Sequence, residues 1–317
     1  MKKHFTFILC IGILLFLFGC RSADESRNKR TIAFVMKTLN NPFFIDMKKG
    51  AEEAAKNLGV DIIIQAAERE VDVEKQMQII ENLIQRKVAA ICITPSGSKE
   101  IIPAILKANK AEIPVIIVDT RIDEKLLKES DGKFATFIGS DNIDGGRIAA
   151  KYIVEKLNGN GYVAILEGIP GHETGDARLQ GFREVISGYK GIKIVATQTA
   201  NWERDQGFNV FQNILQANPK VQAVFACNDI MALGAIEAIS ASQKKNKIIV
   251  VGFDAINDSR EAILSGLMDA SIAQHPEEMG KLSVEYAYKV ITGESIPTDI
   301  SVRIDLITKE YLQRAGK

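Results

Sequence analysis

From Thr31 onward the chain alternates short β-branched apolar runs with longer segments in which apolar residues recur every three or four positions. The run Ile32 to Met36 predicts a strand, and Phe44 to Leu58 predicts a helix that ends at Gly59. The segment Val73 to Arg86 repeats the helical period. This alternation is typical of βαβ units, in which helices cover a parallel sheet.

The alternation continues in two similar series. Strands are predicted at Val60 to Gln65, Val88 to Thr94, Val115 to Asp119 and Ala135 to Gly139, and then at Tyr162 to Leu166, Ile192 to Thr197, Val221 to Cys227, Ile248 to Phe253 and Met268 to Ala273. One sheet holding all these strands would be unusually wide. We therefore predict an α/β protein of two doubly wound, Rossmann-like lobes joined near Ser140.

The N-terminus has a different pattern, in which basic residues 2–4 precede an apolar run over residues 5–18. The run is shorter than the roughly 20 residues that a transmembrane helix needs. We predict a lipoprotein signal peptide over residues 1–19, a lipidated Cys20 and a flexible tether over residues 20–30. The alternatives are ordinary cleavage that releases a free protein, and a retained membrane anchor. The chain is exported in either cleavage model.

Composition narrows the function further. The formal net charge is zero, and Lys and Arg are not gathered among aromatic residues, so no nucleic-acid partner is expected. Cys92 and Cys227 lie in apolar runs without a second Cys or His at metal spacing, which predicts free buried thiols and no metal. There is no glycine-rich nucleotide loop and no nucleophile elbow, and His172 and His275 lie outside nucleophile motifs. We expect neither a cofactor nor an enzyme.

Polar and aromatic residues follow nearly every predicted strand, at the sheet edge where open α/β folds bind ligands. They are Lys37, Asn41, Phe43, Phe44, Asp119, Arg121, Arg178, Trp202, Asn228, Asp254 and Gln274. Carboxylates, amides and Arg bind hydroxyl groups, and aromatic faces cover the apolar side of a sugar ring. In the structural alternative, Phe43, Phe44 and Trp202 only pack in the core, and Asp119 and Asp254 cap helices.

These segments resemble the ribose-binding protein family of bacterial transport receptors, and more closely its D-allose-binding branch. The matching motifs are Lys37-Thr-Leu-Asn-Asn-Pro-Phe-Phe44, Val118-Asp-Thr-Arg-Ile-Asp123, Gly175-Asp-Ala-Arg-Leu-Gln-Gly-Phe182, Ala200-Asn-Trp-Glu-Arg204, Cys227-Asn-Asp-Ile-Met-Ala-Leu-Gly234, Val251-Gly-Phe-Asp254 and Ile272-Ala-Gln274. Lys37 stands where ribose binders carry a small hydroxyl residue. Phe44 replaces the usual Trp of the allose branch, and Thr120 replaces the Arg of ribose binders.

The resemblance implies the type I periplasmic binding protein fold and a set of site residues. The implied sugar contacts are Lys37, Asn41, Phe43, Phe44, Asp119, Arg178, Trp202, Asn228, Asp254 and Gln274. The implied hinge contains Ser140, Asp141 and Asn142, with further crossovers near Gln274 and Pro297. The N-terminal lobe would then comprise residues 31–139 and 275–297, and the C-terminal lobe residues 140–274 and 298–317.

The resemblance also implies a function. The chain would be a monomeric receptor that closes around a monosaccharide and delivers it to an ABC transporter permease. D-Allose leads the expected ligands, with psicose and ribose behind it, and a sugar acid would require an unpaired Lys37. A chemoreceptor or a sensor kinase is the alternative partner. A sugar-responsive repressor is disfavoured because an export signal stands where a DNA-binding domain would be.

Overall fold

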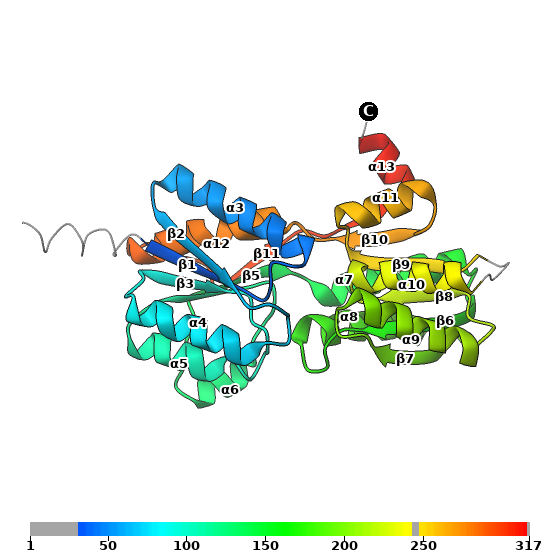
Figure 1. The fold of residues 1–317 in the computed structure, drawn as a ribbon, viewed down its shortest axis with the longest axis horizontal. Coiled ribbons are helices and arrows are strands. Elements are labelled where there is room, and N and C mark those ends of the chain that lie inside the picture. The colour runs from blue at the N-terminus through cyan, green and yellow to red at the C-terminus, as the bar shows by residue number, and fades with distance from the viewer. Residues whose placement is uncertain (1–30, 243–246, 316–317) are drawn as a thin grey trace, which may run out of the picture.

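The computed structural model describes residues 31–242 and 247–315, which form two α/β lobes side by side (Figure 1). The predicted signal peptide over residues 1–19, the lipidated Cys20 and the tether over residues 20–30 lie outside these residues. No helix in the described residues has the length and apolar character needed to cross a membrane. Cys92 and Cys227 are buried free thiols, as predicted.

The N-terminal lobe contains a parallel sheet with the strand order β11-β5-β4-β3-β1-β2. Its strands are β1 (Thr31–Met36), β2 (Asp61–Ala66), β3 (Ala90–Ile93), β4 (Val115–Val118), β5 (Thr136–Ser140) and β11 (Asp299–Val302). Helices α3 (Pro42–Leu58) and α12 (Pro276–Ile291) pack on one face, and α4 (Val73–Gln85), α5 (Ile102–Lys110) and α6 (Glu124–Glu129) pack on the other.

The C-terminal lobe repeats this plan with the order β12-β10-β9-β8-β6-β7. Its strands are β6 (Asn160–Glu167), β7 (Gly191–Thr199), β8 (Ala223–Ala226), β9 (Ile249–Asp254), β10 (Ala270–Ala273) and β12 (Asp305–Thr308). Its helices are α7 (Asn142–Lys156), α8 (Glu173–Ile186), α9 (Arg204–Ala217), α10 (Asp229–Ala241), α11 (Asn257–Ser265) and α13 (Lys309–Ala315). The edge strand β12 runs antiparallel to β10, which the sequence pattern did not predict.

Local sequence signals explain the elements that carry the site. Every residue of β4 and β8 is buried, which fits central strands covered on both faces. Helix α3 begins at Pro42, two residues before its predicted start, because the Asn41 side chain caps it and accepts the Phe43 N–H. The helix ends at Gly59, whose φ of 66° is the left-handed conformation of a C-cap.

The described chain passes between the lobes after β5, after β10 and between β11 and β12. The last crossover therefore lies between Val302 and Asp305, and the predicted crossover near Pro297 is wrong. Asp299–Val302 extends the sheet of the N-terminal lobe by pairing with β5, so residues 299–302 belong to that lobe instead of to the C-terminal one. Pro297 lies in the loop between α12 and β11, and both of these elements belong to the N-terminal lobe.

Helices α7 and α8 approach closely through a reciprocal pair of glycines. A Cβ atom added to Gly146 would lie 2.0 Å from the carbonyl oxygen of Arg178, and one added to Gly181 would lie 1.9 Å from that of Ile143. Gly50 and Gly280 allow the same approach of α3 to α12. Because α7 begins at the hinge and α8 carries Arg178, this packing fixes a predicted binding residue relative to the hinge.

The variant Gly181→Ala is expected to lower the free energy of unfolding by about 1–3 kcal/mol, because the new methyl group must push two helix backbones apart. Urea unfolding followed by circular dichroism measures this change. Gly188→Ala is the matched control, since its Cβ would meet only the Val185 carbonyl oxygen, at 3.4 Å. Equal unfolding midpoints for the two variants would contradict the packing argument.

Candidate ligand-binding site

A small cavity lies between the lobes, at the carboxyl ends of the parallel strands. It is lined by Lys37, Asn41, Phe43, Phe44, Glu70, Asp119, Thr174, Arg178, Trp202, Asn228, Asp254 and Gln274. The structure thus brings together all ten residues named as sugar contacts from the sequence. Glu70 and Thr174 also line the cavity, and sequence reasoning missed both.

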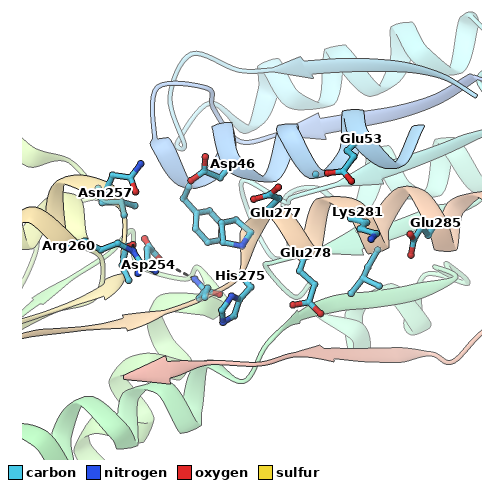
Figure 2. Close-up of a pocket in the computed structure, with 17 residues that line it drawn as sticks. Asp46, Glu53, Asp254, Asn257, Arg260, His275, Glu277, Glu278, Lys281 and Glu285 are labelled. Atoms are coloured by element: carbon cyan, nitrogen blue, oxygen red, sulfur yellow. Dashed lines mark hydrogen bonds between the residues drawn. The ribbon is translucent and has the colours of Figure 1, made fainter. Parts of the chain in front are cut away.

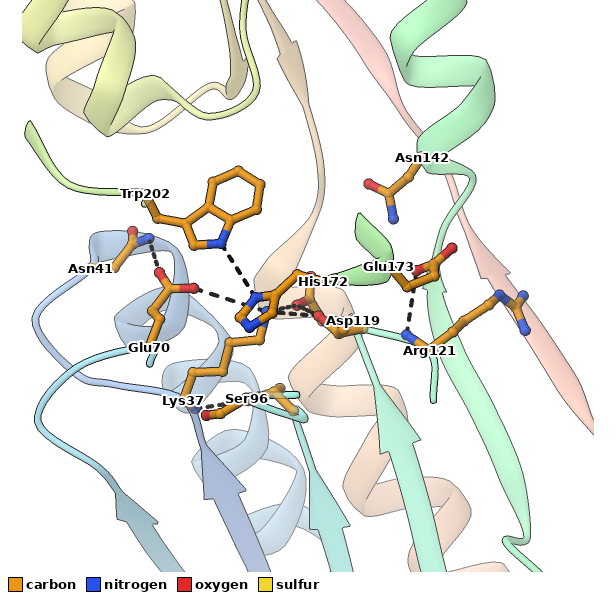
Figure 3. A network of polar contacts seen from close by, with 12 residues as sticks. Lys37, Asn41, Glu70, Ser96, Asp119, Arg121, Asn142, His172, Glu173 and Trp202 are labelled. Atoms are coloured by element: carbon orange, nitrogen blue, oxygen red, sulfur yellow. Dashed lines mark hydrogen bonds and ion pairs between the residues drawn. The ribbon is translucent and has the colours of Figure 1, made fainter. Parts of the chain in front are cut away.

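Lys37 is the cation of the N-terminal half, and it is only 3% exposed. Its Nζ donates to the Thr120 hydroxyl at 2.7 Å and to Asp119 Oδ2 at 3.4 Å, and it lies 3.9 Å from Glu70 Oε2 (Figure 3). A buried ammonium is tolerated when carboxylates pair with it in this way. Lys37 is therefore paired within its own lobe. A sugar acid would require an unpaired Lys37, so this arrangement does not favour one.

Asn41 both caps a helix and lines the cavity. Its Oδ1 caps α3, and its Nδ2 donates to Glu70 Oε1 at 3.3 Å. Burial raises the pKa of Glu70, although Lys37 and Asn41 oppose this rise. Glu70 follows β2, and its neighbours Glu68 and Arg69 make that loop look like an ordinary solvated charge run. We expected site residues after the carboxyl ends of the strands, and the same expectation applied to the loop after β2 would have identified Glu70.

Phe43 and Phe44 lie in the first turn of α3 and form an edge-to-face pair with ring centroids 5.2 Å apart. Both belong to the apolar core of the N-terminal lobe, and both also line the cavity. The structural and the ligand-binding interpretations of these residues are therefore compatible. The ammonium of Lys37 lies 5.7 Å from the centroid of the Phe44 ring.

Arg178 is the cation of the C-terminal half, and α8 delivers it to the cavity. Its Nε donates to Asn142 Oδ1 at 2.8 Å, and its Nη1 donates to the Cys227 carbonyl oxygen at 2.7 Å. Asp254 Oδ1 is 3.8 Å from Nη1, and the guanidinium lies 3.8 Å from the Phe253 ring centroid. Asn142 was predicted as a hinge residue only, and it also orients this side chain.

Trp202 and Asn228 form the adjoining wall. Asn228 caps α10 by accepting the Met231 N–H at 2.8 Å, and its Nδ2 donates to the Trp202 carbonyl oxygen at 3.3 Å. The indole N–H of Trp202 donates to His172 Nδ1 at 3.4 Å (Figure 3). A Cβ atom at Gly168 would lie 1.9 Å from the indole, so only glycine leaves room for the ring there.

His172 was not among the predicted site residues, but it lies between the lobes and is 4% exposed. It belongs to the C-terminal lobe and forms a hydrogen bond with the backbone of Ser96 in the N-terminal lobe. Burial and the nearby Lys37 lower the pKa of His172 to about 3. The neutral imidazole therefore accepts the Trp202 N–H at neutral pH.

Asp254 and Gln274 complete the cavity next to the second crossover. Gln274 Nε2 donates to Asp254 Oδ1 at 2.9 Å. Burial raises the pKa of Asp254 to about 8, and Arg178 opposes the rise. Gln274 Oε1 is buried, and no donor reaches it from residues 31–242 or 247–315. A buried acceptor that receives no hydrogen bond is costly, so this oxygen is suited to a ligand that donates a hydrogen bond to it.

Three of the lining residues have left-handed or otherwise strained backbones. The φ angles are 65° for Asp119, 67° for Trp202 and 109° for Asp254. Each such conformation costs a non-glycine residue about 1–3 kcal/mol, and surrounding contacts must hold it in place. Asp119 and Asp254 are also not helix caps, since Asp123 caps α6 and Ile256 precedes α11.

The start of α8 contacts the N-terminal lobe directly. The Glu173 N–H donates to the Ser98 hydroxyl at 3.3 Å, and the Arg121 N–H donates to Glu173 Oε2 at 3.4 Å. The Arg121 side chain turns away from the cavity to Asp299 Oδ2 at 2.5 Å and stacks on Phe137. The strand-end position of Arg121 thus does not make it a lining residue.

A wider groove opens beside the cavity, where α3 and α12 face α11 (Figure 2). It shares Phe43, Asp254 and Gln274 with the cavity. Charged side chains line much of it, namely Asp46, Glu53, Arg260, Glu277, Glu278, Lys281 and Glu285. The aromatic residues Phe44 and Trp202 and the amides of Asn41 and Asn228 line the cavity and not this groove.

Comparison with known proteins agrees with this geometry. A family model described as a periplasmic binding protein domain matches residues 32–295. The ribose import binding protein of Bacillus subtilis is 38% identical over 98% of this chain and 100% of its own length. The D-allose-binding periplasmic protein of Escherichia coli is 38% identical over 87% of this chain and 89% of its own.

A solved structure of a solute-binding protein from Actinobacillus succinogenes with bound D-allose superposes with a TM-score of 0.85 at 42% identity, covering 90% of this chain and 99% of that one. A relative from Agrobacterium vitis, bound to α-D-tagatopyranose, has the same TM-score at 33% identity and covers 90% of this chain and 97% of that one. Both the sequence and the fold are thus matched over nearly the whole described body. The chain therefore belongs to the periplasmic binding protein family of exported solute receptors, which bind their ligands without being enzymes.

Proposed function

We propose that this chain is the receptor of a sugar ABC transporter and that it takes a neutral monosaccharide of the D-allose or D-ribose type. The convergence of polar and aromatic side chains from both lobes on one small cavity carries the proposal. Gln274 Oε1, which is buried and receives no hydrogen bond from the described part of the chain, supplies an acceptor for a sugar hydroxyl. Relatives named for ribose and for D-allose support the same class of ligand.

The charges around the cavity favour a neutral ligand. Lys37 and Arg178 provide two cations, whereas Glu70, Asp119 and Asp254 provide three carboxyl groups. Each cation already has a carboxyl group of its own lobe beside it. A sugar acid would add a further negative charge to a desolvated site, which is unfavourable without an unpaired cation.

In the proposed cycle, a sugar binds to one lobe of an open form and hinge bending brings the other lobe onto it. Closure excludes water and strengthens the hydrogen bonds inside the cavity. The contacts of His172 and Glu173 with the N-terminal lobe would form during the same movement. The closed form would then dock on a permease, with a chemoreceptor or sensor kinase as the second candidate partner.

A thermal-shift panel tests the proposal with D-allose, D-psicose, D-ribose, D-glucose and the sugar acid D-gluconate. One of the neutral sugars is expected to stabilise the protein by about 2.7 kcal/mol at 100 times its Kd, whereas gluconate is expected to have no effect. A shift with gluconate alone, or no shift with any neutral sugar, would contradict the proposal.

Arg178→Ala and Arg147→Ala are matched variants for this panel. Arg178 lines the cavity, whereas Arg147 forms an exposed ion pair with Glu184 on the surface of the same lobe. The sugar-dependent shift is expected to disappear in the first variant and to persist in the second.

Acid is expected to destabilise the closed protein through His172. The pKa of the folded state, about 3, lies below the usual value near 6.5, so the unfolded chain binds one more proton between these limits. The contribution of His172 to the free energy of unfolding should therefore decrease as the pH falls from about 6.5 toward 4, whereas buried Asp254, whose pKa is raised, contributes in the opposite direction. Urea unfolding of wild type and His172→Gln at several pH values isolates the His172 contribution, because the difference in stability between the two should shrink or reverse in favour of the variant as the pH falls. Identical slopes for wild type and variant would refute the assignment.

We also propose that a lipid on Cys20 holds the protein at the outer face of the cytoplasmic membrane or in the periplasm. This proposal rests on the signal pattern of residues 1–19. Cell fractionation should find the wild type with membranes and Cys20→Ser in the soluble fraction. A wild type that is itself soluble would support ordinary cleavage.

A further inference from the structure

Asp229 lies behind the cavity wall and is fully buried at the first position of α10, directly after the lining residue Asn228. It does not itself line the cavity. Its Oδ1 accepts the hydroxyl of Ser271 at 2.7 Å, and its Oδ2 accepts the Ile256 N–H at 2.9 Å. Both oxygens are thus occupied by neutral donors from β10 and from the loop between β9 and α11.

The Ser271 hydroxyl extends this contact by one further step. While it donates to Asp229, its oxygen accepts the Ala255 N–H at 3.0 Å. The backbone N–H groups of Ala255 and Ile256 are therefore both held, one through Ser271 and one directly, by a single carboxylate. These two residues immediately follow Asp254, the carboxyl group that faces the cavity.

The segment held in this way is strained. Asp254 has a φ of 109° and Ala255 a φ of 52°, so two consecutive non-glycine residues have positive φ angles. Such conformations persist only where surrounding contacts enforce them. An extended or helical alternative at Asp254 would turn its carboxyl group away from Gln274 Nε2, which lies 2.9 Å from it, and from Arg178.

The neighbouring strand is shaped to admit the Asp229 carboxylate. Gly252 on β9 pairs with Ser271 on β10, and a Cβ atom at Gly252 would lie 2.1 Å from Asp229 Oδ1. Any side chain at this position would displace the carboxylate. Burial raises the pKa of Asp229 to about 7, whereas the donated hydrogen bonds oppose the rise. Burying this carboxyl group is costly, and it holds two backbone N–H groups of the loop, that of Ile256 directly and that of Ala255 through Ser271.

We propose that Asp229 and Ser271 are positioning residues for sugar binding, which hold the strained Asp254–Ile256 segment so that the Asp254 carboxyl group faces the ligand. This inference rests on the proposed function of the cavity. It predicts that changes at Asp229 or Ser271 weaken sugar binding only through Asp254.

A double-mutant cycle tests this dependence, with D-allose and D-ribose as probes and calorimetric titration as the measurement. Ser271→Ala and Asp229→Asn should each weaken binding by about 10-fold, and Asp229→Ala by more, because Asn keeps one acceptor for the loop. In an Asp254→Asn background, the same changes should cost less than about 3-fold. Equal losses in both backgrounds, or unchanged affinity in the single variants, would overturn the proposal.

Asp269→Ala is the matched control. Asp269 also holds a backbone group of β9, since its Oδ2 accepts the Val250 N–H at 3.0 Å, but it lies at the end of the strand away from the cavity. Loss of this contact should lower the unfolding midpoint and leave the sugar affinity unchanged. If Asp269→Ala lost as much affinity as Ser271→Ala, the effect of both changes would be general loss of structure, and the inference would be wrong.

Amide hydrogen exchange, measured without sugar, separates this inference from the proposed function. Exchange at Ala255 and Ile256 should accelerate about 10-fold or more in Ser271→Ala and Asp229→Asn, and not in Asp269→Ala. If the wild type binds neither sugar, the proposed function fails for these ligands. Unchanged exchange in the variants would refute the proposal that Asp229 and Ser271 hold the Asp254–Ile256 segment, whether or not a sugar binds. Accelerated exchange confined to the loop would support it.

Discussion

The structure depends on balancing buried charge separately within each lobe. Lys37 and Arg178 are 3% and 4% exposed, and neither would be stable in the interior without hydrogen-bond acceptors and carboxyl groups close to it. Lys37 is paired with Asp119 in its own lobe, and Arg178 lies beside Asp254 in its own. The contacts that join the lobes at the start of α8 include hydrogen bonds of His172 with the backbone of Ser96 and of Glu173 with Ser98 and the backbone of Arg121. The lobes can therefore part without leaving either buried cation unpaired.

The fold could be predicted from the sequence because its signals are periodic and local. Apolar runs such as Val115–Val118 became central strands, and the helical period of the residues between them placed the helices. The edges of the sheets were less predictable. Asp299–Val302 and Asp305–Thr308 are partly exposed, so they lack the continuous apolar run of a central strand. Nothing in their pattern shows that they join different sheets.

The site was predictable where its residues follow the carboxyl ends of the predicted strands. Side chains directly after the strands, such as Asn41 and Asn228, line the cavity and also cap helices, so the structural and the ligand-binding interpretations hold together. Glu70 was missed because a carboxylate in a charged loop looks solvated until the opposite lobe covers it. The sequence pattern also contained no sign of the hydrogen bond between His172 and the backbone of Ser96 in the other lobe. Contacts made between lobes leave no periodic pattern in the sequence.

The third crossover also constrains the order in which the protein can fold. Strand β11 completes the edge of the first sheet and β12 the edge of the second, and both follow α12 in the chain. Neither lobe has its full set of strand pairs until this last part of the chain is available. A chain that is still being made, or is still passing through a membrane, lacks these edges, so the finished receptor forms only after translocation has delivered its C-terminal residues.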